Sequence, residues 1–278
     1  MTKTIEVPGV GTLPVIERKG DTDLFGFDSE KPDEGTAFST GYIPRDLKEH
    51  PYGSIEYATP FDLPSPSRSD WPELVRAYNA GGASPAHHFI NSGKECSNQN
   101  GLPYCWIHGS VQNLMVVRMM QGLPYVYLEP TSAGAIIKRF AQRGGNTPEA
   151  IKHLAEHGVC EGSLWPPNKL DRDLVTDEMK ENSKKYRITE WFELRNNSFE
   201  QTVASLLYGY PVTVGFSWWG HMVLAVGLAV LDDGSIGIIM LNSWGPKWGF
   251  RGLAVLNEKM GTSFDQFALR VGTYSVVA

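Results

Sequence analysis

Four apolar runs separated by turn residues fill the last third of the chain: PVTVGFS (211–217), HMVLAVGLAVL (221–231), IGIIMLNSW (236–244) and RGLAVLN (251–257). Runs of this length, rich in valine and isoleucine and bounded by glycines, predict β-strands. Between the second and third runs, Asp232-Asp233-Gly234-Ser235 has the composition of a hairpin turn. We therefore expect an antiparallel sheet in this part of the chain.

The section before these strands has the pattern of helices. Residues 105–121 are apolar on most faces and are followed by glycine and proline, which predicts a buried helix. Thr147 as an N-cap, followed by Pro148 at the first helical position, predicts a second helix. Ser198 with Gln201 three residues on predicts a third helix that begins with a capping box. Helices followed by a sheet indicate an α+β protein with two lobes.

Prolines are concentrated in the first third, where 10 of the 18 lie before residue 96. They interrupt every candidate helix up to about residue 70, after which a short helix is expected over 72–78. We expect residues 1–69 to form an extended arm that either covers a site or grips a partner. Residues 70–278 would form the main domain, with a helical lobe over about 95–210 and a sheet lobe over about 211–278.

Composition excludes several classes of protein. The 278 residues are 41% apolar and 20% charged, as in a globular protein, and the formal charge of −6 disfavours a nucleic-acid partner. The longest apolar stretch, Met222 to Leu231, is far shorter than the roughly 18 residues of a membrane span. No apolar region follows the N-terminal lysine, so no secretory signal is expected. Three cysteines fit a reducing compartment, and we expect a cytoplasmic or virion-associated protein.

Cys105 is the candidate nucleophile, because it stands at the start of a predicted helix, whose dipole stabilises a thiolate. A buried cysteine that acts as a small hydrophobe is the alternative at this point. His221 opens an apolar strand and could serve as the base. Cys96 is expected in a loop and Cys160 in the core. The remaining histidines show no spacing typical of metal ligands, so neither a metal nor a cofactor is expected.

Four blocks, in order, resemble the papain-like cysteine peptidases. They are Gln99-Asn-Gly-Leu-Pro-Tyr-Cys105-Trp106, Gly144-Gly145, Gly220-His221-Met-Val-Leu-Ala-Val-Gly227 and Leu241-Asn242-Ser243-Trp244-Gly245-Pro-Lys-Trp248-Gly249-Phe-Arg-Gly252. The last block matches the family pattern N-S-W-G-x-x-W-G-x-x-G at every fixed position. The resemblance covers roughly residues 70–278 and is discontinuous. It implies a papain-like fold, with a helical left lobe, an antiparallel β-barrel-like right lobe and the active site in the cleft between them.

The resemblance also implies roles for individual residues. Cys105 would be the nucleophile, His221 its general base, Asn242 the group that orients the imidazole and Gln99 the oxyanion donor. The residues expected to line the substrate site are Gly144, Gly145, Met222 and Trp244, of which Trp244 would also shield the imidazole hydrogen bond.

Departures from the family pattern point to a non-secreted bacterial or viral branch. Leu102 and Pro103 stand where secreted members carry a disulfide cysteine and a glycine, and the first 70 residues do not resemble the usual helical pro-segment. The expected activity is hydrolysis of peptide amides in a peptide or protein substrate. Two alternatives stay open: a catalytically silent binding protein in a larger assembly, and an acyl or isopeptide transferase that uses the same residues.

Overall fold

The computed structural model describes residues 3–21 and 39–269. In these residues one mixed sheet has the strand order β1-β2-β8-β7-β6-β5-β9-β4-β3. Its strands are β1 (Thr4–Val7), β2 (Gly11–Ile16), β3 (Ala58–Pro60), β4 (Trp191–Glu193), β5 (Val212–Phe216), β6 (His221–Val230), β7 (Ile236–Leu241), β8 (Leu253–Asn257) and β9 (Asp265–Leu269). The sheet is open, because β1 and β3 lie at opposite edges. This corrects the expectation of a barrel-like right lobe.

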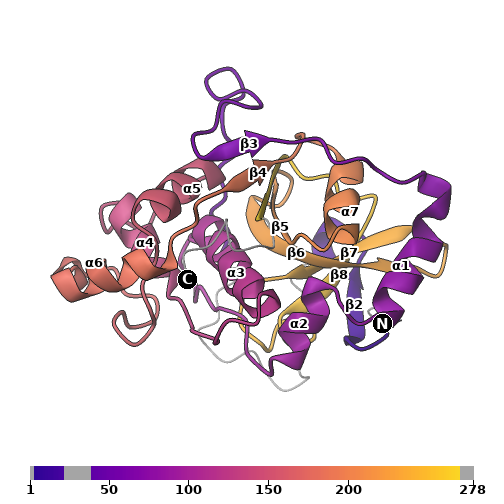
Figure 1. The fold of residues 1–278 in the computed structure, drawn as a ribbon, viewed down its shortest axis with the longest axis horizontal. Helices are drawn as coiled ribbons and strands as arrows, with labels where there is room; N and C mark the ends of the chain where they lie inside the picture. Colours follow the sequence, from indigo (N-terminus) through magenta and orange to yellow (C-terminus); the bar gives the residue numbers. More distant parts are fainter. Residues whose placement is uncertain (1–2, 22–38, 270–278) are drawn as a thin grey trace.

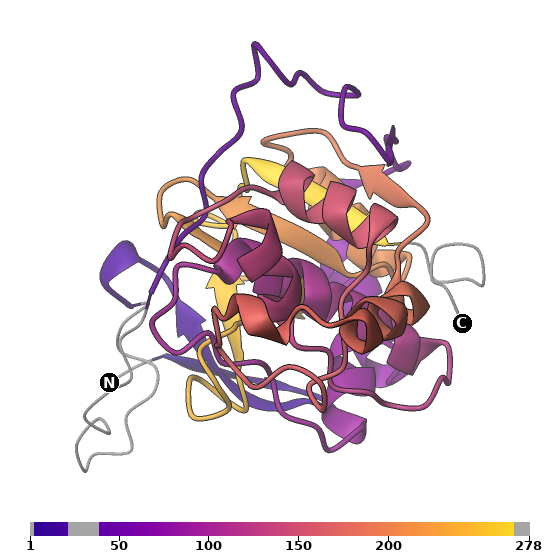
Figure 2. The same cartoon turned by 90° about the vertical axis from the view of Figure 1, so that its left-hand side faces the viewer.

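Helices cover the sheet and continue beyond one end of it. They are α1 (Trp71–Ala80), α2 (Pro85–Asn91), α3 (Cys105–Met120), α4 (Pro130–Ile137), α5 (Thr147–Glu156), α6 (Asp177–Ser183) and α7 (Phe199–Leu207), with 3-10 turns at Lys19–Asp21, Arg68–Asp70, Arg172–Leu174 and Lys184–Tyr186. Figure 1 shows α4, α5 and α6 gathered beside α3, with α1 and α7 on the other side of the molecule. In Figure 2 the helices of the first group stand in front of the sheet. The α+β class is confirmed.

Helix α3 is the element that joins the two parts. Every residue from Cys105 to Arg118 is buried, as expected for a helix that is apolar on most faces. Its side chains share one core cluster with Met222 of β6 and Phe267 of β9, and with residues of α4 and α5. Because α3 is packed on all sides, its first residue, Cys105, is fixed in position against the sheet.

The N-terminal residues contribute to the sheet, which differs from a purely extended arm. β1 and β2 form an antiparallel hairpin, and β2 runs parallel to β8 through Val15 and Val255. Leu13, Val15 and Ile16 are buried. Leu13 and Val15 pack in one core cluster and Ile16 in another, so burial of apolar surface on both faces of β2 outweighs the proline of this strand. The expectation of extended chain describes residues 39–46, whereas residues 47–57 consist mostly of turns.

Two helix caps differ from the sequence prediction. The N-cap of α5 is Asn146, which makes a full capping box with Glu149, so Thr147 is the first helical residue. The Ser198 cap of α7 is present, but the Gln201 amide bonds both backbone groups of Leu63 instead of returning to Ser198. Gln201 therefore fastens residue 63 to the helix. No helix in the described ranges is long and apolar enough to span a bilayer.

Candidate active site

Cys105 begins α3, just after a turn in which Asn100 and Gly101 have positive φ angles of 42° and 80°. The side chain is fully buried, and burial raises the pKa of the thiol to about 12. Backbone N–H groups of Met222, Tyr42 and Trp106 act on the sulfur in the opposite direction. These neighbouring backbone groups favour a thiolate, although burial dominates the pKa of the thiol in this state.

His221, the first residue of β6, is hydrogen-bonded to Asn242, which follows β7. Its Nε2 lies 2.7 Å from Oδ1 of Asn242, and the same oxygen accepts the Ser243 N–H, also at 2.7 Å. An amide oxygen only accepts, so Nε2 carries the proton and Nδ1 presents its lone pair. Nδ1 is buried and has no hydrogen-bond partner within the described part of the chain. This tautomer leaves Nδ1 free to accept a proton.

Two tryptophans enclose the imidazole. The centroid of the Trp244 ring lies 4.6 Å from that of the His221 ring, and the centroid of the Trp219 ring lies 4.7 Å from it. Burial lowers the pKa of His221 to about 4, and the hydrogen bond with Asn242 offsets only part of that shift. The imidazole is therefore neutral near pH 7 in this state.

Gln99 reaches the same place through a short pairing of two loops. Asn98 forms an antiparallel bridge with Trp244, and Gln99 N–H donates to the Ser243 carbonyl at 2.8 Å. The Gln99 Oε1 accepts from the Ser243 hydroxyl at 2.6 Å, which leaves its Nε2 free to donate elsewhere. That Nε2 donates to the carbonyl oxygens of Leu102 at 2.7 Å and Ser39 at 2.9 Å.

Residues 39–45 lie directly over these groups. Gly145 N–H donates to the Gly41 carbonyl and Ile43 N–H donates to the Gly145 carbonyl, both at 2.9 Å. The N–H groups of Gly41 and Tyr42 both donate to the Gly220 carbonyl, at 3.1 and 2.9 Å. We call the surface that holds segment 39–45 the arm site. It binds this segment as an extended peptide, through its main chain.

Two glycines of the arm site, Gly144 and Gly145, permit close contacts with neighbouring groups. A Cβ added at Gly144 would stand 2.5 Å from the Gly41 carbonyl oxygen, and one at Gly145 would stand 2.7 Å from the Trp106 ring. Neither glycine has a positive φ, so close contact and not backbone conformation is the constraint. On the segment itself, a Cβ at Gly41 would lie 2.1 Å from the Pro103 carbonyl oxygen.

The Tyr42 side chain is buried in the arm site. Its ring stands where a side chain at Gly215 would be, 2.5 Å from an added Cβ, and its hydroxyl donates to Oδ2 of Asp265 at 2.7 Å. Met222, the register partner of Gly215, belongs to the same core cluster as Tyr42. Burial raises the pKa of both Tyr42 and Asp265.

The expected site residues thus fall in one region. Asn242 bonds His221, and the N–H of Met222 acts on Cys105. Further residues of the region that sequence reasoning missed are Ser39, Gly41, Tyr42, Arg45, Gly215, Trp219 and Asp265. Only Trp219 had a local signal, since it stands two residues before the histidine; the others depend on long-range contacts. No group of potential metal ligands is present in residues 3–21 and 39–269.

Comparison with solved structures identifies the fold. Xylellain, a cysteine protease from Xylella fastidiosa, is 17% identical and has a TM-score of 0.58, over 83% of this chain and 95% of that chain. Procathepsin L 3 of the Tenebrio molitor larval midgut is 15% identical, with a TM-score of 0.54 over 84% of each chain. Bromelain from Ananas comosus, solved with the inhibitor E64, is 19% identical, with a TM-score of 0.51 over 64% of this chain and 95% of that one.

The chain therefore has a papain-like fold. No family model matches the sequence, and no curated protein matches it either. At these identities the likeness defines the fold, while the chemistry depends on the residues of the site.

Proposed function

We propose that this protein is a cysteine peptidase that hydrolyses peptide amide bonds, and that segment 39–45 holds it in a latent state. The observation that carries the proposal is a main-chain segment hydrogen-bonded to Gly145, Gly220 and Gln99 over a buried cysteine. A surface that binds an extended peptide through its backbone is suited to a peptide substrate once the segment has left.

In the proposed reaction the Nδ1 of His221 takes the thiol proton of Cys105. The resulting sulfur attacks the carbonyl carbon of the substrate, and the carbonyl oxygen becomes an oxyanion. His221 then gives the proton to the leaving amine, and the C–N bond breaks. Water, deprotonated by His221, attacks the thioester and releases the acid and the thiol. Asn242 holds the imidazole in the required tautomer throughout.

Gln99 is the proposed donor to the oxyanion. Its amide is fixed by Ser243, and its Nε2 already donates to a peptide carbonyl oxygen of the segment. Loss of one donor of this kind costs about 2.7–4 kcal/mol of transition-state stabilisation. Because the donor is held before substrate arrives, it requires little reorganisation during the reaction.

The proposed latency follows from the protonation states of Cys105 and His221 in the covered site. With the segment in place, burial favours the neutral forms of both Cys105 and His221. Departure of the segment would admit water and leave the N–H groups of Met222 and Trp106 beside the sulfur, which lowers the pKa of the thiol. We therefore propose that displacement of residues 39–45 creates the reactive thiolate.

The test measures the rate at which E64 alkylates each cysteine, by peptide mapping. Gly41→Ala should displace the segment, because its new Cβ meets the Pro103 carbonyl, whereas Gly20→Ala meets no atom within 4 Å and serves as the control. We expect rapid labelling of Cys105 in Gly41→Ala and slow labelling in the control. Cys96 and Cys160, both buried free thiols, should stay unlabelled in each. Equal labelling of the three cysteines in Gly41→Ala would overturn the proposal and favour a silent binding protein.

A further inference from the structure

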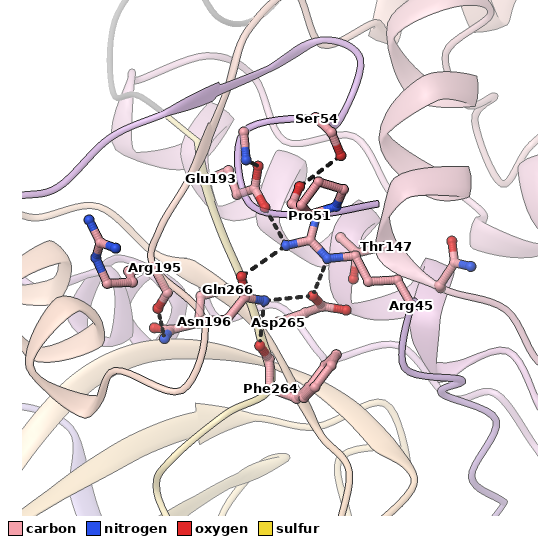
Figure 3. Close-up of polar contacts among 12 residues, drawn as sticks. Arg45, Pro51, Ser54, Thr147, Glu193, Arg195, Asn196, Phe264, Asp265 and Gln266 are labelled. Carbon is pink, nitrogen blue, oxygen red and sulfur yellow. Dashed lines mark hydrogen bonds and ion pairs between the residues drawn. The ribbon is translucent and has the colours of Figure 1, made fainter. Parts of the chain in front are cut away.

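Arg45, the last residue of segment 39–45, is enclosed by acceptors from the sheet lobe. Its guanidinium forms ion pairs with Glu193, at the end of β4, and with Oδ1 of Asp265, at the start of β9, the latter at 3.0 Å. Its Nη2 also donates to Oδ1 of Asn196 at 3.0 Å. Figure 3 shows the guanidinium between these side chains. We call Glu193, Asn196 and Asp265 the guanidinium site.

The guanidinium site is buried, and both of its carboxylates belong to the main domain. The side chains of Arg45, Glu193 and Asp265 are all 0% exposed. Two carboxylates in such surroundings are stable only with a partner cation, and removal of the cation leaves them uncompensated. Arg45 supplies that cation from the segment that, by the proposed function, must leave. An open arm site would therefore present two carboxylates and an amide oxygen.

This site continues directly from the surface that binds the peptide backbone. Asp265 bonds both Arg45 and the Tyr42 hydroxyl, and Tyr42 forms the backbone bridge with Gly145. Asp265 is also the register partner of Gly215, against which the Tyr42 ring packs. A peptide chain bound along Gly145 therefore passes within one side-chain length of the guanidinium site.

We infer, on the basis of the proposed function, that the guanidinium site selects peptide substrates with an arginine side chain positioned to reach Glu193, Asn196 and Asp265. A planar guanidinium can meet two carboxylates and an amide oxygen at once, which the single ammonium of lysine cannot do in the same geometry. The Phe267 ring, 5.6 Å from the Arg45 guanidinium carbon, favours the same group. The segment thus resembles, in its side chains, the substrate that replaces it.

The first experiment measures binding, so that it does not depend on turnover. The protein is the full chain with Gly41→Ala, Arg45→Ala and Cys105→Ala, which opens the arm site and removes the nucleophile. The probes are a fluorescent peptide with the sequence of residues 39–47 and its twin with citrulline, an uncharged analogue of the same shape, in place of arginine. We expect the arginine peptide to bind roughly 10- to 100-fold more tightly, the factor of a charge-assisted hydrogen bond.

Adding Glu193→Gln and Asp265→Asn to the same protein should abolish this preference. The two replacements keep the shapes of the side chains and remove their negative charges. Asp62→Asn is the matched control, since Asp62 pairs with Arg195 at the surface and should leave the preference unchanged. Equal binding of the two peptides would overturn the inference, as would a preference that survives the double replacement. If the triple variant does not fold, Tyr42→Ala replaces Gly41→Ala as the opening mutation.

The second experiment tests selection during turnover. Gly41→Ala with Arg45→Ala, with Cys105 intact, is given fluorogenic tetrapeptides in which arginine, lysine, citrulline or leucine is scanned through each position before the cleaved bond. We expect one position at which arginine raises kcat/KM about tenfold or more, lost on Glu193→Gln with Asp265→Asn. Cleavage without any arginine preference would contradict the inference and leave the proposed function intact. A binding preference without cleavage of any peptide would contradict the proposed function alone.

Discussion

The carbonyl oxygen of Ser39 accepts a hydrogen bond from Nε2 of Gln99 across 2.9 Å, and a second from Nε1 of Trp244 across 3.0 Å. Two donors that converge on one carbonyl oxygen form the arrangement that stabilises an oxyanion. In this structure the oxygen belongs to the chain itself. The segment therefore occupies the position that we assign to the carbonyl of a substrate.

Arg45→Ala should loosen segment 39–45. Loss of one partner from a buried ion pair typically costs about 3–5 kcal/mol, and detachment of the segment would let water reach Glu193 and Asp265 instead. We expect faster proteolysis between residues 39 and 57 in this variant. Arg68→Ala is the control, because Arg68 is 54% exposed and its ion pairs with Glu200 and Glu258 contribute little. Equal cleavage rates in the two variants would show that Arg45 does not fasten the segment.

Asn242→Ala, made in Gly41→Ala, should impair catalysis and weaken the fold moderately. It leaves the Ser243 N–H and the His221 Nε2–H without their acceptor, which costs about 1–3 kcal/mol. We expect kcat/KM to fall roughly 10- to 100-fold, less than the 10²–10⁴ that a general base itself contributes. The control is Asn79→Ala, which also removes a buried amide that bonds the main chain. If both variants lost the same activity, Asn242 would have no orienting role.

Trp219→Ala should raise the pKa of His221 from about 4 toward its ordinary value of 6.5, because burial is the main cause of the depression. Trp218→Ala is the control, since Trp218 stacks on Trp219 and donates to the Met260 carbonyl instead of facing the imidazole. NMR titration of the His221 ring measures both. An unchanged pKa in Trp219→Ala would show that other groups keep water from the ring.

His108→Gln should change how stability depends on pH. Burial lowers the pKa of His108 to about 3 in the folded protein, against 6.5 when unfolded. Between pH 6.5 and 3 the unfolded chain therefore binds a proton at His108 that the folded chain does not bind. The stability that neutral His108 contributes above pH 6.5 is lost as pH falls toward 3. Glutamine cannot titrate, so the stability of wild type relative to the variant should decline by about 2 kcal/mol between pH 7 and 5.

Urea denaturation at the two pH values measures this difference. Glutamine keeps a polar group beside the Ser97 hydroxyl, which lies 2.9 Å from Nδ1 of His108, so the variant should fold. A difference that stays constant across the range would mean that His108 has the same pKa in the folded and unfolded protein.

Local pattern was enough to predict the elements that carry the site. The apolar run after Cys105 is α3, and the strands expected after Pro211 are β5 to β8, with the Asp232-Asp233-Gly234-Ser235 turn between β6 and β7. In each case hydrophobic periodicity and a turn residue decide the structure within about 15 residues. The sequence blocks also predicted the papain-like fold, which the solved structures confirm.

Long-range pairing accounts for what the sequence could not predict. β2 joins β8 across more than 230 residues of chain, and Tyr42 bonds Asp265 at a separation of 223. No periodicity marks such partners, because each is decided by packing after the rest of the fold has formed. The sequence left open whether the arm covers a site or grips a partner, and it did not mark Arg45, the buried residue on which the proposed covering role largely depends.

The most direct test of latent cysteine peptidase activity is the rate at which purified Gly41→Ala hydrolyses an unstructured, arginine-containing polypeptide, with the double variant Gly41→Ala, Cys105→Ala assayed beside it. We predict turnover in Gly41→Ala, at least about 10²-fold slower turnover in wild type, and none above background in the double variant. Comparable hydrolysis by the protein that lacks Cys105, or no hydrolysis by Gly41→Ala in which E64 still labels Cys105, would contradict the proposed activity.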